Sequence, residues 1–128
     1  AVSGPMADGQ PWAISVDNPR DADAPLGLLL LSGGGVATSG RDYRRWKVGD
    51  SWRHHIIDPR SGLPAATAAL TATAVAPSAR EAEVAAKLLF ILGGEGIAWL
   101  QGRPGYAGMV LCEDGGQLPS AGWAGYLA

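Results

Sequence analysis

The chain has 128 residues, of which 47% are hydrophobic and 17% charged, so it is long enough for one globular domain with its own core. A formal net charge of -2 gives no basic excess for binding nucleic acid or an anionic membrane surface. The single cysteine, Cys112, excludes an internal disulfide framework, and no apolar run approaches the roughly 18 residues that a membrane span needs. The first ten residues lack the basic start and apolar block of a signal peptide, so we expect the natural N-terminus to lie upstream.

The first part of the chain predicts strands. PWAISVD (11–17) alternates apolar and polar residues and leads into an NPRD turn. The continuous apolar run PLGLLLLSGGG (25–35) predicts a buried strand, and the small residues of GVATSG (35–40) extend the chain further. RRWKVGDSWRHHIID (44–58) carries a Val-Gly-Asp turn between two strand-like arms and predicts a hairpin. ALTATAVAPS (69–78) is rich in Thr, Val and Ala and predicts one more strand.

Helical signals follow. Ser78 is the expected N-cap, with Glu81 as its capping-box partner, and Gly93-Gly94 end the helix. Helical spacing predicts one apolar face made of Val84, Ala85, Leu88, Ile91 and Leu92.

The end of the chain predicts a second, shorter helix in EGIAWLQGRPG (95–105) and a closing hairpin in residues 106–123, with Asp-Gly-Gly as its turn. The element order indicates an α+β domain in which helices pack on one face of a mainly antiparallel sheet.

His54 and His55 are the only histidines, and strand alternation forbids both from facing one site. His55 should lie on the same side as Ile57, and His54 on the same side as Ile56. Either ring could serve a catalytic site or be an ordinary strand residue with a satisfied ring. Asp58 begins a typical Asp-Pro turn, so its carboxylate has a structural explanation of its own.

Two further features are ambiguous when each is taken alone. The glycine-rich segment SGGGVATSG (32–40) admits a ligand close to the backbone, but it is neither a P-loop nor a dinucleotide fingerprint. Glu83 and Lys87 stand four residues apart in the order that favours an exposed helical ion pair.

Taken in order, these segments resemble the C-terminal half of the ApbE family of flavin transferases, from about Trp12 to the end. The matching pieces are ATSG with the aromatic and basic stretch after it, HIIDPRSGLP, the strand ending APSAREAE, and the helix ending LLFILGGEGIAWL. HIIDPRSG (55–62) is the most specific piece. The resemblance implies an ApbE-like, T-fold-like half domain over residues 1–128, with an N-terminal part missing.

The resemblance also implies an activity. The family transfers FMN from FAD to a Ser or Thr hydroxyl of a target protein and releases AMP, usually with magnesium at the pyrophosphate. His55 is similar to the family's histidine at the pyrophosphate, a candidate base or charge stabiliser. Thr38, Ser39 and Gly40 match a loop beside the flavin nucleotide, and Asp58 joins this cofactor-binding set. The family's proteins are bacterial, extracytoplasmic and often lipid-anchored.

The chain departs from the family at two places. The family's N-terminal half carries much of the FAD pocket, so a shortened piece or one part of a longer protein is expected. The family's helix offers an Asp and, four residues later, a Thr or Asp to the metal, where this chain has Glu83 and Lys87. Glu83 can still ligate, whereas a protonated Lys87 cannot. We therefore expect no well-ordered magnesium between them, and a bond from Lys87 to Glu83, an anion or water.

The sequence leaves three functions open: an FMN transferase, an FAD pyrophosphatase that uses water as acceptor, and a non-catalytic flavin-binding module with a degenerate metal site. Lys87 could replace part of the metal charge as a donor to phosphate oxygens, or mark a site that has lost activity. In each case the helix of residues 78–93 should bring Glu83 and Lys87 near the ATSG segment and His55.

Overall fold

The computed structural model describes residues 1–128, and its centre is a four-stranded antiparallel sheet in the order β10-β9-β8-β3. Its strands are β3 (Gly35–Gly40), β8 (Ala69–Ala76), β9 (Ala107–Cys112) and β10 (Gln117–Pro119). Both outer strands, β3 and β10, have one free edge. Strand β8 is buried along almost its whole length because layers cover both faces of the sheet.

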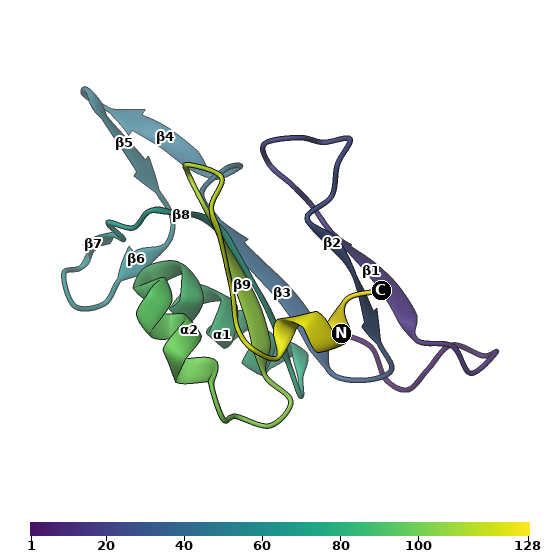
Figure 1. The fold of residues 1–128 in the computed structure, drawn as a ribbon. Helices are drawn as coiled ribbons and strands as arrows, with labels where there is room; N and C mark the ends of the chain where they lie inside the picture. The colour runs from purple at the N-terminus through teal and green to yellow at the C-terminus, as the bar shows by residue number, and fades with distance from the viewer.

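Helix α1 (Ala79–Leu92) and the shorter α2 (Gly94–Leu100) form one of these layers, and α1 packs across β8 and β3 (Figure 1). The α+β arrangement with helices on one face of an antiparallel sheet is therefore confirmed. Ser78 caps α1, since its Oγ accepts a hydrogen bond from the Glu81 amide at 3.3 Å and donates one to the Glu81 carboxylate at 2.6 Å. Neither helix has the length and hydrophobicity that crossing a bilayer requires.

The predicted apolar face of α1 is wrong in most of its members. Val84 is 59% exposed, and Leu88, Ile91 and Leu92 are only partly covered. The face against the sheet is formed by Ala82, Ala85, Ala86, Leu89 and Phe90. Three of these five residues are alanines, because the helix lies very close to the strands.

Two glycines show how close the approach is. A Cβ on Gly35 in β3 would stand 2.5 Å from the Ala79 backbone, and one on Gly108 in β9 would stand 2.4 Å from Leu89 Cδ1. Both distances are shorter than any real carbon contact. Glycine at these positions therefore allows α1 to rest on the sheet.

A hairpin of β1 (Trp12–Val16) and β2 (Gly27–Leu31) lies over the opposite face of the sheet, with a 3-10 helix at Trp123–Tyr126. Its buried side chains join those of the sheet in a second core: Val16, Leu29, Leu31, Val75, Ala107, Met109, Leu111 and Trp123. The buried strand predicted for the Leu-rich run is half right. Leu29 and Leu31 point into this core, whereas Leu28 and Leu30 are 42% and 37% exposed.

Two small ribbons connect β3 to β8. Strands β4 (Arg45–Val48) and β5 (Ser51–His54) form the predicted hairpin around Gly49, and they project from the rest of the molecule (Figure 1). Strands β6 (Ile57–Asp58) and β7 (Leu63–Pro64) enclose the Asp-Pro turn. The closing hairpin of β9 and β10 is also confirmed.

Candidate active-site cleft at the edge of the sheet

A cleft of about 420 Å³ lies at the free edge of the sheet, along the end of β3. Thr38, Ser39 and Gly40 line it from β3, so they belong to an edge strand rather than to the predicted loop. Thr38 Oγ1 lies 2.9 Å from Thr73 Oγ1, which fixes its hydroxyl against the neighbouring strand. A Cβ on Gly40 would stand 2.6 Å from Asp42 Oδ1 and 2.8 Å from Thr71 Cγ2, so a side chain there would force both neighbours to shift.

Helix α1 supplies the second wall through Glu83 and Lys87. Lys87 Nζ donates to Glu83 Oε1, which is the i,i+4 ion pair that the spacing predicts. Both side chains are about half exposed, so the pair contributes only a few tenths of a kcal/mol to stability. The ion pair is important for its position at the cleft rather than for its contribution to stability.

The third wall comes from the two ends of the β4–β5 hairpin. Tyr43 and Arg44 precede the hairpin, His55 follows it, and all three line the cleft. His55 Nδ1 lies 3.4 Å from the Arg44 carbonyl oxygen. A carbonyl oxygen can only accept, so this contact is a hydrogen bond in the tautomer protonated at Nδ1, in which Nε2 is free to take a proton. The structure thus brings His55, Glu83, Lys87 and the ATSG segment to one cleft.

Sequence reasoning missed the other side of the cleft. Ser15, Asp17 and Pro19 reach it from the end of β1, and Asp42 and Thr71 complete the wall near Gly40. No local motif marks these residues, because only the packing of the β1–β2 hairpin beside β3 brings them there. The aromatic and basic stretch after ATSG was the one available signal for Tyr43 and Arg44.

His54 lies on the other side of its strand, as alternation predicts. It is 6% exposed, its ring meets Phe90 edge-on at 5.6 Å, and Ile56 beside it is also buried. Nε2 lies 3.1 Å from the Ala65 carbonyl oxygen, and Nδ1 accepts from the Ile56 amide at 3.3 Å. These contacts define a neutral ring protonated at Nε2. Burial is the main cause that lowers the pKa of His54.

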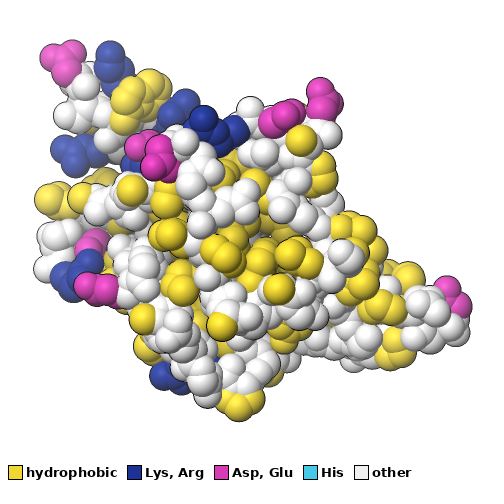
Figure 2. Space-filling view, viewed as in Figure 1, with side chains coloured by type: hydrophobic (Ala, Val, Ile, Leu, Met, Phe, Trp, Pro, Cys, Tyr) yellow, Lys and Arg dark blue, Asp and Glu magenta, His cyan; other side chains and the backbone are white.

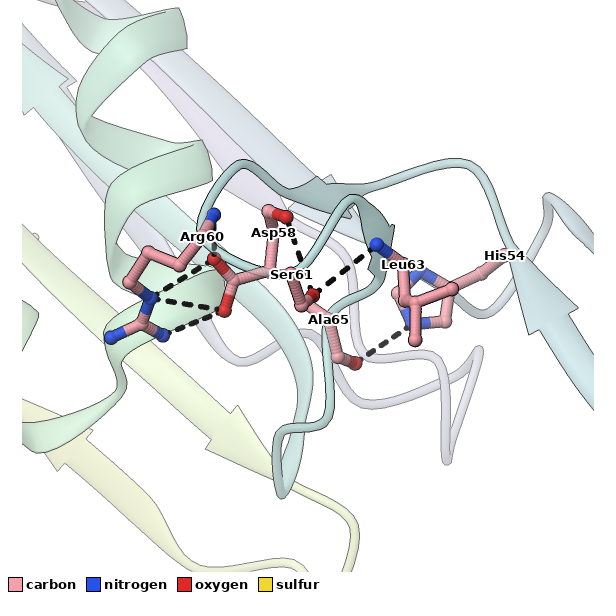
Figure 3. A network of polar contacts seen from close by, with 6 residues as sticks. All are labelled: His54, Asp58, Arg60, Ser61, Leu63 and Ala65. Atoms are coloured by element: carbon pink, nitrogen blue, oxygen red, sulfur yellow. Dashed lines mark hydrogen bonds and ion pairs between the residues drawn. The ribbon is translucent and has the colours of Figure 1, made fainter.

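Asp58 does not line the cleft. Its carboxylate accepts hydrogen bonds from the Arg60 amide at 2.9 Å and from the Arg60 guanidinium at 2.7 to 3.1 Å (Figure 3). The Gly62 amide donates to the Asp58 carbonyl oxygen at 2.8 Å. The side-chain hydrogen bonds from Arg60 lower the pKa of Asp58. The structure therefore shows a turn residue here, and Figure 3 shows Arg60 folded back onto it.

The donors of this chain do not fit a magnesium ion. No group of three or more His, Cys, Asp or Glu side chains lies close enough together to hold a metal. Glu83, whose carboxylate could ligate a metal, already accepts from the Lys87 ammonium. Magnesium requires near-octahedral oxygen coordination, and an adjacent ammonium opposes it.

Comparison with known proteins shows which family the chain belongs to. The family model described as "ApbE family" matches residues 1–110. The chain belongs to the ApbE family. An FAD:protein FMN transferase of Salmonella typhimurium is 32% identical over 114 residues, which cover 88% of this chain and 32% of the relative. One from Klebsiella pneumoniae is 39% identical over 95 residues, or 72% of this chain and 30% of the relative.

Solved structures show the same fold. The ApbE protein of Thermotoga maritima superposes with a TM-score of 0.86 at 27% identity, covering 98% of this chain and 41% of that one. The flavin transferase ApbE of Vibrio cholerae gives a TM-score of 0.74 at 26% identity, with coverages of 98% and 41%. This chain therefore spans about a third of the length of the sequence relatives and two fifths of the structural ones.

Proposed function

We propose that this chain forms part of an FAD:protein FMN transferase, which moves FMN from FAD to a Ser or Thr hydroxyl of a target flavoprotein and releases AMP. The observation that carries the proposal is His55 at the cleft, with Nδ1 directed to the Arg44 carbonyl and Nε2 free. Family membership and the printed name of the Salmonella relative support the choice of reaction.

In this proposal His55 acts as a general base. Nε2 takes the proton of the acceptor hydroxyl while the hydroxyl oxygen attacks the FMN phosphorus. The bond from that phosphorus to the bridging oxygen breaks, and AMP leaves with the bridging oxygen. A cleft of about 420 Å³ is within the range of about 300–1,000 Å³ typical of small-molecule pockets.

The charge of the pyrophosphate needs cationic partners. Arg44 and Lys87 both line the cleft and are the cations that this chain offers to phosphate oxygens. Magnesium, when bound in relatives of this kind, would polarise the pyrophosphate, but residues 1–128 do not supply its ligands.

The proposal also places the protein outside the bacterial cytoplasm, which cell fractionation tests.

The deciding experiment uses the complete natural polypeptide that contains these residues, with FAD and a purified flavoprotein carrying the acceptor hydroxyl. We expect the FMN mass on the acceptor and equimolar AMP, and neither product with a Ser/Thr→Ala acceptor. Free FMN with AMP and no labelled acceptor would instead identify a pyrophosphatase. No turnover at all would leave a flavin-binding module.

A further inference from the structure

The most basic segment of the chain stands beside the cleft, and the proposed chemistry uses only Arg44 of its charged residues. Residues 43–54, named here the basic ribbon, comprise the β4–β5 hairpin and the two residues before it. They hold four of the ten Lys and Arg residues and one of the twelve Asp and Glu residues. The basic ribbon therefore carries a charge of +3, whereas the rest of the chain carries -5.

Large aromatic side chains accompany these charges. Tyr43 is 83% exposed, Trp52 62% and Trp46 49%. Figure 2 shows Lys and Arg side chains gathered with hydrophobic ones over the part of the molecule where β4 and β5 project. Trp, Tyr and Arg are the residues enriched where protein interfaces derive most of their binding energy.

Both faces of the basic ribbon have this mixed character. The strand register puts Arg45, Lys47 and Trp52 on one face, where the Arg45 guanidinium lies 5.0 Å from the Trp52 ring centroid. Trp46 and Arg53 share the other face. A segment that lies on a membrane separates its apolar side from its charged side. No such separation exists here, so the pattern favours a protein partner.

The position of the basic ribbon specifies what that partner does. It begins with Tyr43 and Arg44 and is followed directly by His55, and these three residues line the cleft. A macromolecule that brings its hydroxyl to His55 therefore comes close to the base of the ribbon.

We propose that the basic ribbon is the docking surface for the acceptor protein, and that the acceptor presents acidic side chains around its Ser or Thr. This proposal rests on the proposed function. Positive charge on the ribbon attracts an acidic partner to an otherwise acidic molecule, and the exposed tryptophans provide apolar area once the partner is seated.

The test removes one face of the ribbon without touching the cleft. The variant Arg45→Gln/Lys47→Gln/Trp52→Ser changes three exposed side chains in the complete natural polypeptide. The control Arg80→Gln/Arg103→Gln removes the same charge from exposed residues outside the ribbon. We expect the ribbon variant to raise the KM for the acceptor at least tenfold, with kcat and the KM for FAD unchanged. The control should change KM less than twofold, and both proteins should keep the wild-type Tm.

A second measurement does not require turnover. Fluorescence anisotropy with a labelled polyglutamate peptide of twenty residues should show salt-sensitive binding to wild type and to the control, and at least tenfold weaker binding to the ribbon variant. An unchanged acceptor KM in the ribbon variant, or an equal rise in the control, would overturn the docking assignment. So would a variant that loses only binding to anionic phospholipid vesicles. Absence of FMN transfer in wild type, with polyglutamate binding retained, would overturn the proposed function and leave the ribbon as a surface for acidic proteins.

Discussion

His54, the last residue of β5, and His55, which follows it, face opposite sides of the chain and behave as different regions of the molecule. On the inner side, His54 is enclosed by Phe90 and Ile56 and satisfied at both ring nitrogens. On the outer side, His55 faces a cleft, its Nδ1 contacts the Arg44 carbonyl oxygen, and its Nε2 is free. The same side chain thus serves structure in one position and is available for chemistry in the next.

The two histidines differ in how many of their ring nitrogens take part in hydrogen bonds. The Ile56 amide requires an acceptor at His54 Nδ1, so that ring can carry only one proton without losing a bond. No amide engages His55 Nε2. Substitution of the two residues should therefore have opposite consequences for stability and for activity.

Removal of His54 should have the largest effect. His54→Ala deletes a buried ring and leaves the Ala65 carbonyl and the Ile56 amide without their partner, which costs about 3 kcal/mol of unfolding free energy. Urea denaturation measures the loss. The matched variant His55→Ala removes an exposed ring and should change stability by no more than about 0.5 kcal/mol. Equal losses in the two variants would contradict the inner and outer assignment.

Removal of His55 should reverse the pattern. We expect His55→Ala and His55→Gln to lower FMN transfer by about 10²-fold or more, since neither side chain can accept the hydroxyl proton at neutral pH. Initial rates of acceptor labelling with the complete natural polypeptide check this. His54→Ala, assayed at a temperature where it stays folded, should keep most of its activity. A His55 variant with the wild-type rate would remove His55 from the mechanism.

How far the sequence predicts this contrast depends on the range of the interactions. Alternation along one strand is local, and it separated His54 from His55 correctly. The cap at Ser78 and the hairpin around Gly49 are also local and were correct. The face of α1 was wrong because a pattern of large apolar residues ignores how closely the sheet approaches. Gly35 and Gly108 set that approach, and they lie far from the helix in the chain.

The cleft was predictable only in part for the same reason. Its β3 segment, His55 and the α1 pair follow from motif order. Asp17 and Ser15 arrive through the packing of a separate hairpin. Asp58 carried a strong motif signal, yet its two carboxylate oxygens are occupied by Arg60 within the turn. A motif match therefore does not show whether a side chain of the turn faces the cleft.

The pH dependence of stability sharpens the comparison. Burial lowers the pKa of His54 in the folded state, so the unfolded chain binds its proton at a higher pH than the folded chain does. The contribution of neutral His54 to the free energy of unfolding is fully present above the ordinary histidine pKa of about 6.5 and is lost as the pH falls below it. Urea midpoints between pH 5.5 and 7.5 should rise with pH in wild type and in His55→Gln. The slope should flatten in His54→Gln, and an unchanged slope there would assign the titration to another group.

The smallest expected effect concerns Lys87, on the outer side with His55. Its ammonium bonds Glu83 and contributes a positive charge to the cleft, so it opposes a divalent cation at the same place. Lys87→Thr removes that charge and adds an oxygen donor, which frees Glu83 for a metal. We expect transfer by the complete natural polypeptide to become several-fold more dependent on magnesium in this variant.

Lys87→Met removes the charge without adding an oxygen, and it should lower the rate without creating the same dependence. A magnesium titration of all three proteins at fixed FAD decides the point. A Lys87→Thr curve that superposes on wild type would show that Lys87 does not occupy a cation position.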